Sequence, residues 1–258
     1  MLRLRQIWAI AKVTLQENLR KQLLQVVLLL TMGAIAATTL LSFFDLGVQI
    51  KILKDLSLAA ILFAGGVLAI TVTVASIPGE VQSHTIYSYL ARPLGRSDYL
   101  AAKYLGAVLT CLVCLSILAV VFLGILAGYE HRLDTAVLTG MGYVFLQVAL
   151  LAAVGTFFSV FLAPMVSATL TIFVFLLGQI KVSYLHHLIE NSPSAISQAV
   201  LSVFYFLLPN LDCFSFKDAL VHGNPVPPDY MLMVAVYGVV YTAFLLCVSG
   251  LVFARKEV

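Results

Sequence analysis

Charge is what this sequence has least of. Only 10% of its 258 residues are charged and 62% are hydrophobic, whereas a soluble domain carries about 25% charged residues. A chain this apolar cannot cover a globular surface in water, which excludes a soluble enzyme or a soluble binding domain. The sequence also lacks a basic tract, so we expect no nucleic-acid partner. The composition is typical of an all-α, multi-pass membrane protein.

Motifs for catalysis and cofactor binding are also missing. The sequence has no G-x-x-x-x-G-K-[ST] phosphate loop, no H-E-x-x-H zinc motif and no G-x-S-x-G nucleophile elbow. Cys111 and Cys114 form a C-x-x-C pair, which suits a soft metal such as Cu(I). They lie inside an apolar run, however, so packing as small apolar residues is the favoured interpretation. His186 and His187 are adjacent and would point about 100° apart on a helix, which fits a polar interface better than a chelating pair. We therefore expect no catalytic residue, bound cofactor or metal in this chain.

Long apolar runs are what the sequence does have. A bilayer core about 30 Å thick needs roughly 20 apolar residues for each helix that crosses it. Six runs meet this length and predict six transmembrane helices: 22–44, 56–77, 103–128, 135–162, 165–189 and 230–253.

The spans contain almost no ionisable residues. Apart from Lys103, the first residue of the third span, Lys181 is the one charge, and it lies near the far end of the fifth span, where a long side chain can reach the interface. Carriers coupled to protons or sodium ions usually keep ionisable residues at mid-membrane. The pattern therefore disfavours a coupled secondary carrier.

The distribution of basic residues predicts the orientation. With the N-terminus in the cytoplasm, the inner side holds most of the 15 Lys and Arg residues, as the positive-inside rule requires. An even number of spans also returns the C-terminus to the cytoplasm, and we expect the chain in the cell membrane. The inner group consists of Arg3, Arg5, Lys12, Arg20, Lys21, Arg92, Arg96, Lys103, Arg255 and Lys256.

The six spans lie within a transmembrane domain of residues 22–258. One further segment precedes this domain, and another lies within it between the fifth and sixth spans. Residues 1–21 have the period of an amphipathic helix, with a polar face that includes Arg5 and Lys12, and we expect it to lie in the inner interface; the alternative is a cytoplasmic extension of the first span. The apolar face consists of Leu4, Ile7, Trp8, Ala11, Leu15 and Leu19. The outer segment 190–229 is either a lid or partner-binding face, or a cap on the helix bundle.

The longest polar interruption in the first half of the chain is the cytoplasmic loop 78–102. Within it, Val81 to Leu90 can form a short helix, and Ser97 or Asp98 can cap the following span. The side chains of Ile86, Tyr87 and Leu90 make an apolar face on this helix. Such a face suits insertion into a groove on a partner protein.

This loop resembles the first cytoplasmic loop of ABC-2 type transporter permeases. The pattern is Glu80-x3-His84-Thr85-x4-Leu90-x2-Pro93-x2-Arg96-x6-Lys103, and His84 stands where the family commonly has glycine. The likeness extends to the layout of six spans and to the fourth–fifth hairpin. Within the family, the chain is similar to permeases connected with multicopper-enzyme maturation, such as that for nitrous-oxide reductase.

The resemblance implies a division of labour between chains. Two permease copies, identical or different, would form the pore, and two separate ATPase subunits would hold ATP and magnesium. Loop residues Glu80, His84, Thr85, Ile86, Tyr87, Leu90, Pro93 and Arg96 would contact the ATPase as a coupling helix. A second coupling turn would comprise Ala163, Pro164 and Ser167. Residues 190–229 offer a surface for an extracytoplasmic accessory protein.

Two function classes follow from these observations. The leading hypothesis is a non-catalytic ABC-2 permease subunit of an exporter. The alternative is a membrane scaffold that recruits an ATPase or a maturation factor without transporting anything. An intramembrane enzyme ranks third, because the spans lack a set of ionisable residues.

Overall fold

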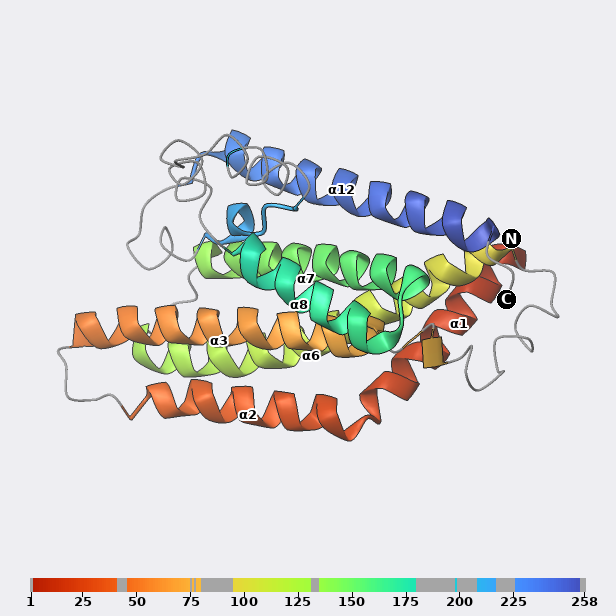
Figure 1. Cartoon of the computed structure of the whole chain (residues 1–258). Coiled ribbons are helices and arrows are strands. Elements are labelled where there is room, and N and C mark those ends of the chain that lie inside the picture. Colours follow the sequence, from red (N-terminus) through yellow and green to blue (C-terminus); the bar gives the residue numbers. More distant parts are fainter. Residues whose placement is uncertain are drawn as a thin grey trace.

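The structure is a computed structural model, and it describes residues 2–40, 46–74, 76, 78–79, 95–130, 135–179, 198, 208–216 and 226–255. Within these ranges the chain forms helices and turns and no strand. The helices, labelled in Figure 1, are α1 (Leu2–Leu19), α2 (Gln22–Thr38), α3 (Leu46–Val74), α6 (Arg96–Glu130), α7 (Thr135–Phe161), α8 (Pro164–Gly178), the short η1 (Asp212–Phe214) and α12 (Pro228–Arg255).

Four of these helices are long and apolar enough to cross a membrane. They contain the candidate spans Val48–Val74, Ser97–Tyr129, Val137–Phe161 and Pro228–Ala254. Helices α1 and α2 together provide a fifth candidate, a span bent by 65° at the break between them. The described residues therefore make an all-helical, multi-pass membrane protein with four to five candidate spans. The fifth expected span, 165–189, extends past Gly178, the last residue of α8.

The helices begin and end at positions that differ from the apolar runs. Helix α3 begins at Leu46 and α6 at Arg96, well before the apolar runs that start at residues 56 and 103. Helix α2 ends at Thr38, before residue 44. Hydropathy marks the part of a helix that suits hydrocarbon, whereas backbone hydrogen bonds continue through charged turns such as the one containing Lys51 and Asp55.

The bundle has two distinct ends. Helices α2, α3, α6, α7, α8 and α12 alternate in direction along its long axis (Figure 1). One end, called the proximal end below, holds both chain termini, the start of α6 and the turn between α7 and α8. The opposite, distal end holds the end of α2, the start of α7 and the segment 208–216. All sequence segments expected in the cytoplasm, where the structure describes them, thus lie at the same end.

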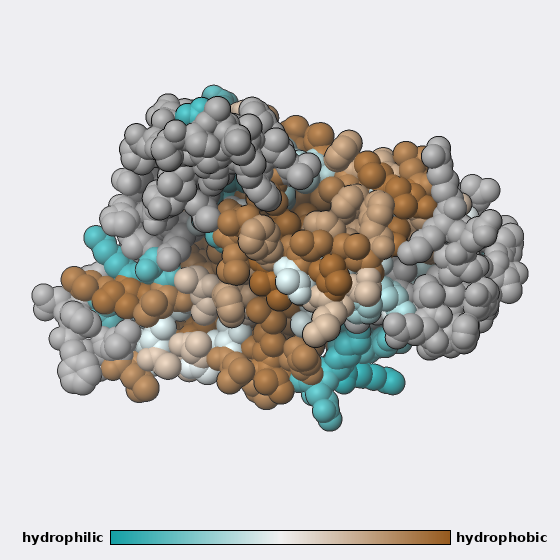
Figure 2. All heavy atoms as spheres, viewed as in Figure 1, coloured by the Kyte–Doolittle hydropathy of each residue, from teal (hydrophilic) through white to brown (hydrophobic). Residues whose placement is uncertain are grey.

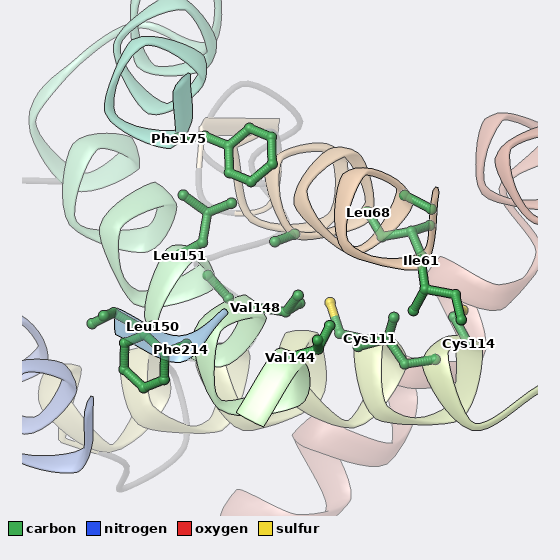
Figure 3. Close-up of a cluster of buried hydrophobic side chains, with 14 of the residues drawn as sticks. Ile61, Leu68, Cys111, Cys114, Val144, Val148, Leu150, Leu151, Phe175 and Phe214 are labelled. Carbon is green, nitrogen blue, oxygen red and sulfur yellow. The ribbon is translucent and has the colours of Figure 1, made fainter. Parts of the chain in front are cut away.

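Helix α7 is the centre of the bundle and packs against α3, α6, α8 and α12. Its residues 150–156 are all buried, which occurs only when a helix is surrounded on every side. The core around it contains Leu68 of α3 and Phe175 of α8, together with Cys111 and Cys114 of α6 (Figure 3). The two cysteines are fully buried, as apolar packing residues would be.

The outside of the bundle is apolar where a membrane would meet it. Figure 2 shows hydrophobic residues over much of the described surface, with hydrophilic residues mainly toward the ends. In α12 only 17% of the most apolar stretch is buried, and Leu232, Met233, Val239 and Phe244 are all exposed. In water such a surface would favour aggregation, whereas lipid chains cover it without cost.

The face of helix α1 that packs against the bundle includes residues that the sequence did not single out. Ile10, Ala11, Thr14 and Asn18 are buried, and Trp8 is 60% exposed. The helix packs mainly on α6, where small and hydrogen-bonding side chains allow close approach. Its predicted polar residues Arg5, Lys12, Gln16 and Arg20 are all exposed.

Candidate functional site

The structure describes only part of the predicted coupling site. Glu80, His84, Thr85, Ile86, Tyr87, Leu90 and Pro93 lie outside the described residues, as do His186 and His187. Arg96 is the first residue of α6, but its side chain is not described. The second coupling turn, with Ala163, Pro164 and Ser167, is described in full.

The turn between α7 and α8 is as short as its sequence predicts. Helix α7 ends at Phe161, and Ala163 adopts an extended conformation with φ −63° and ψ 152°. Pro164 then opens α8, where its missing N–H leaves no hydrogen bond unmade. The backbone N–H of Ser167 donates to the carbonyl of Ala163 at 3.0 Å. The two helices therefore form a tight hairpin whose turn lies at the proximal end.

Small residues fix this hairpin to α3. Gly155 of α7 lies so close to Thr73 of α3 that a Cβ atom at this glycine would collide with the threonine Oγ1, and it would also touch Thr171 of α8. Thr171 donates its hydroxyl to the carbonyl of Ser167 at 2.7 Å. Ser167 is itself completely buried, and its own hydroxyl has no hydrogen-bond partner. We call Thr73, Gly155, Ser167 and Thr171 the small-residue seam.

The start of α6 lies nearer to the cytoplasmic loop than its sequence suggests. The backbone N–H of Tyr99 donates to the carbonyl of Gly95 at 3.1 Å, which puts Gly95 in the capping position. The prediction that Ser97 or Asp98 caps this helix is therefore wrong. Glycine is accepted at this position because it adapts to the non-helical geometry of a cap. Asp98 lies in the first turn, where its negative charge interacts favourably with the positive end of the helix dipole.

A small buried cluster joins the ends of three helices at the proximal end. It consists of Tyr99 and Leu100 of α6, Val160 of α7 and Phe253 of α12. The rings of Tyr99 and Phe253 are stacked with their centroids 6.1 Å apart. We call these four residues the end cluster. It links the end of the expected cytoplasmic loop to the hairpin turn, since Tyr99 and Leu100 are among the last residues of 78–102 and Val160 precedes Ala163.

Polar contacts between α1 and α6 were not expected from the sequence. Gly106 of α6 lies against Thr14, and a Cβ atom there would come within 2.7 Å of the threonine Cβ. One turn further along, the Asn18 amide donates to the hydroxyl of Thr110 at 3.4 Å. Asn18 also accepts a hydrogen bond of 2.7 Å from the ammonium of Lys21. The spacing of Thr14 and Asn18 by four residues was the available signal for this polar stripe.

The glycine pairs Gly65-Gly66 and Gly140-x-Gly142 prove to have different roles. Added Cβ atoms at Gly65 and Gly66 would come within 2.6 Å of Val148 and Phe175, so both glycines allow close helix packing. Gly140 lines a cavity. Gly142 has open space, because a Cβ atom added there would meet no other atom within 4 Å.

The longest described stretch of the outer segment before α12, residues 208–216, caps the distal end of the bundle. The backbone N–H of Leu211 donates to the carbonyl of Gly178, the last residue of α8, at 3.0 Å. Phe214 is fully buried, and its ring lies against the backbone of Gly238 in α12. The N–H of Asn210 donates to the Tyr237 hydroxyl at 3.0 Å. This piece of the chain therefore acts structurally as a cap.

Cys213 belongs to this cap and is not a reactive thiol. Its Sγ donates to the carbonyl of Asn210 at 3.0 Å. Burial, followed by the negative charge of Asp212, raises the pKa of the Cys213 thiol to about 12. Only the thiolate form of cysteine is a good nucleophile, so the protonated Cys213 thiol reacts slowly near neutral pH.

These features define the class: a multi-pass helical membrane protein with closely packed helices. A family model, described as a protein of unknown function (DUF2705), matches residues 49–258. The chain belongs to this family. The match covers α3 through α12 and begins after α1 and α2. A comparison with curated proteins finds no match.

Proposed function

We propose that this chain is the non-catalytic permease subunit of an ABC-2 type transporter and acts in export. The observation that carries the proposal is the end cluster. It joins the last residues of the expected cytoplasmic loop, Tyr99 and Leu100, to Val160, which precedes the hairpin turn. These are the two segments through which the resemblance to ABC-2 permeases implies contact with an ATPase.

The end cluster would transmit motion because it is buried and close-packed. Packed side chains shift as a unit, since separating them opens a void. A push on the loop before Gly95 would therefore also move Val160 and Phe253, and with them α7 and α12. The small-residue seam would carry the motion onward from α7 and α8 to α3. Energy from ATP would thus reach the spans mechanically.

The wider arrangement follows from this function. We propose six spans, with α8 continuing into the fifth, and both termini in the cytoplasm at the proximal end. Helix α1 would lie at the inner interface, with Trp8 toward the lipid and its basic residues toward the headgroups. Two permease copies and two ATPase subunits would form the complex in the cell membrane. ATP and magnesium would bind to the ATPase subunits alone.

The test uses one variant on each proposed coupling segment. Leu90→Asp and Ala163→Asp place a charge on the loop and on the exposed turn, and Thr39→Asp places the same charge on a partly exposed site at the distal end. The readouts are co-purification and ATP hydrolysis with an ATP-binding-cassette ATPase encoded beside this chain. We expect the first two variants to lose ATPase binding by about tenfold or more while inserting normally, and the control to bind as the wild type does. Equal binding by all three variants would refute the docking role.

A second candidate function is a membrane scaffold that recruits an ATPase or a maturation factor without transport. The cap formed by 208–216 favours it, because this segment packs against Gly178 at the end of α8 and against Gly238 of α12, and so covers the distal side of the bundle. Reconstitution of the chain with its ATPase in vesicles separates the two functions. Substrate-stimulated hydrolysis supports the permease, whereas ATPase docking without any stimulation supports the scaffold.

A further inference from the structure

A small cavity lies between α3, α7 and the cap, toward the distal half of the bundle. Its volume is about 20 Å³, which is room for one water-sized group. The cavity is partly open, and most of its wall is apolar. The lining consists of Leu58, Leu62, Gly140, Val144, Gln147, Ser215 and Phe216.

Gln147 is the exceptional residue of this lining. It lies near the middle of α7 and is only 1% exposed. Neither its Nε2 nor its Oε1 has a hydrogen-bond partner. A buried polar group without a partner destabilises the fold, and the hydrocarbon core of a membrane offers no water to offset that cost. Most buried polar residues are hydrogen-bonded, so this pair of unsatisfied atoms calls for a ligand or a functional reason.

Several other buried polar residues in the bundle avoid this cost. Thr73, Thr156 and Ser249 each donate to a carbonyl on the preceding turn of their own helix. The glutamine side chain is longer, and in this structure it makes no such bond. Its carboxamide therefore offers both a free donor and a free acceptor at the wall of the cavity.

The surroundings of the cavity select a neutral ligand. None of the lining residues is charged. Lys54 lies one helical turn from Leu58 on α3, but it already has an interaction partner. An ionised group would lose its hydration here without gaining an opposite charge from the cavity wall. A hydroxyl group, by contrast, both donates and accepts, and so satisfies both atoms of the Gln147 carboxamide.

We propose that this cavity is a binding site for the hydroxyl head of a neutral, long-chain amphiphile. The hydroxyl group would occupy the cavity and bond to Gln147, while Leu58, Leu62 and Phe216 would contact the first carbons of its chain. The rest of the chain would lie in the surrounding lipid. The site stands on the cavity and the unsatisfied carboxamide alone, and it does not depend on the chain being a permease.

The test is photolabelling of the full-length protein in phosphatidylcholine vesicles. The probe is decan-1-ol with a diazirine beside the hydroxyl-bearing carbon, and labelled residues are mapped by mass spectrometry. We expect labelling within α7 around Gly140 to Gln147. An excess of decan-1-ol should compete with the probe, whereas decane should not. Competition by both compounds alike would overturn the proposal, because the cavity would then recognise only hydrocarbon.

Two matched variants test the carboxamide itself. Gln147→Met keeps the approximate volume and removes both polar atoms, and Gln49→Met makes the same exchange at a buried glutamine outside the cavity. We expect labelling of α7 to fall by about fivefold or more in Gln147→Met, because the hydroxyl group loses its hydrogen bonds. Gln49→Met should label as the wild type does. Unchanged labelling in Gln147→Met would overturn the site.

Thermal unfolding without the probe adds a readout that a structural glutamine would not give. If Gln147 serves to bind a ligand, the Gln147→Met substitution removes an unsatisfied polar group. The variant protein should then unfold at the same temperature as the wild type or at a higher one. The wild type, but not this variant, should gain stability when decan-1-ol is added. A variant that fails to fold would refute the proposal, since it would show that the carboxamide serves the fold.

Discussion

The two halves of α7 are built differently, although one continuous helix forms both. In the proximal half, residues 150–156 are all buried, and Gly155 packs without any spare space against Thr73. In the distal half, Gly142 lies on the exposed surface with no side chain opposite it, and Gln147 lines a cavity with its carboxamide unsatisfied. Close packing makes the first half rigid, whereas the second half keeps room for another molecule.

This difference separates two tasks along one helix. The proximal half contributes Val160 to the end cluster and Gly155 to the small-residue seam. A rigid connection between these two groups would serve the proposed coupling to an ATPase. The distal half contains a cavity and a buried carboxamide without hydrogen bonds. In natural proteins such imperfections occur mainly where function requires them. The comparison predicts that substitutions in the proximal half destabilise the protein strongly and that those in the distal half do not.

The largest effect is expected in the end cluster. Tyr99→Ala removes a fully buried ring that stacks on Phe253, and loss of a large buried aromatic side chain costs about 3–5 kcal/mol. Tyr230→Ala is the distal control, because Tyr230 is 45% exposed and should cost about 1 kcal/mol or less. Thermal unfolding in detergent measures both variants. Equal destabilisation would contradict the difference between the two ends.

The glycines of α7 test the comparison within one helix. Gly155→Ala forces a Cβ atom into Thr73 and should destabilise the protein by about 1–3 kcal/mol. Gly142→Ala meets nothing within 4 Å and should stabilise the helix by up to about 1 kcal/mol.

A rescue variant identifies the cause of the loss at Gly155. Thr73→Ala removes the hydroxyl that the added Cβ atom would meet, so Gly155→Ala combined with Thr73→Ala should recover part of the lost stability. A double-mutant cycle from unfolding curves measures this coupling. Strict additivity of the two substitutions would mean that the steric explanation is wrong.

A smaller effect is expected where α1 meets α6. Asn18→Ala removes the hydrogen bond to Thr110 and the one from Lys21, and should cost about 1–2 kcal/mol. Gln16→Ala is the control, because Gln16 is exposed on the opposite side of α1. Limited proteolysis at residues 20–21 reports whether α1 has separated from α6. If both variants are cleaved at the wild-type rate, the polar stripe does not hold α1 in place.

The smallest effect concerns reactivity rather than stability. A chain in which Cys213 is the sole cysteine should react with a maleimide about tenfold or more slowly when folded than when unfolded at pH 8. The physical reason is that burial raises the pKa of this thiol to about 12, so it stays protonated. In the folded chain the rate should still be rising between pH 9 and pH 10. A plateau in that range would place the pKa near its ordinary value.

The sequence predicted the features that depend on local pattern. The all-helical, multi-pass class follows from the scarcity of charge, and the hairpin turn follows from Pro164 after a long apolar run. The polar residues on α1 were correctly expected to be exposed. The number of spans and their orientation remain predictions, as do the coupling residues from Glu80 to Pro93.

Other features were wrong or missed because they depend on partners far away in the chain. The cap of α6 lies at Gly95 rather than at Ser97 or Asp98. The contact of Thr14 with α6 was missed, because it depends on Gly106, which leaves room for that side chain. The cavity beside Gln147 was not foreseen, since in the sequence this glutamine is one polar residue in a long apolar run.

The sequence by itself thus determined that the chain belongs in a membrane, because the free energy of moving a side chain from water to lipid depends mainly on that side chain. Only the tertiary structure decided where α7 is tight and where it is open. That outcome depends on which side chains of α3, α8 and the cap arrive opposite each turn of α7. Gly155 lies against Thr73 with no space between them. Gln147, by contrast, lies beside a cavity and has no hydrogen-bond partner.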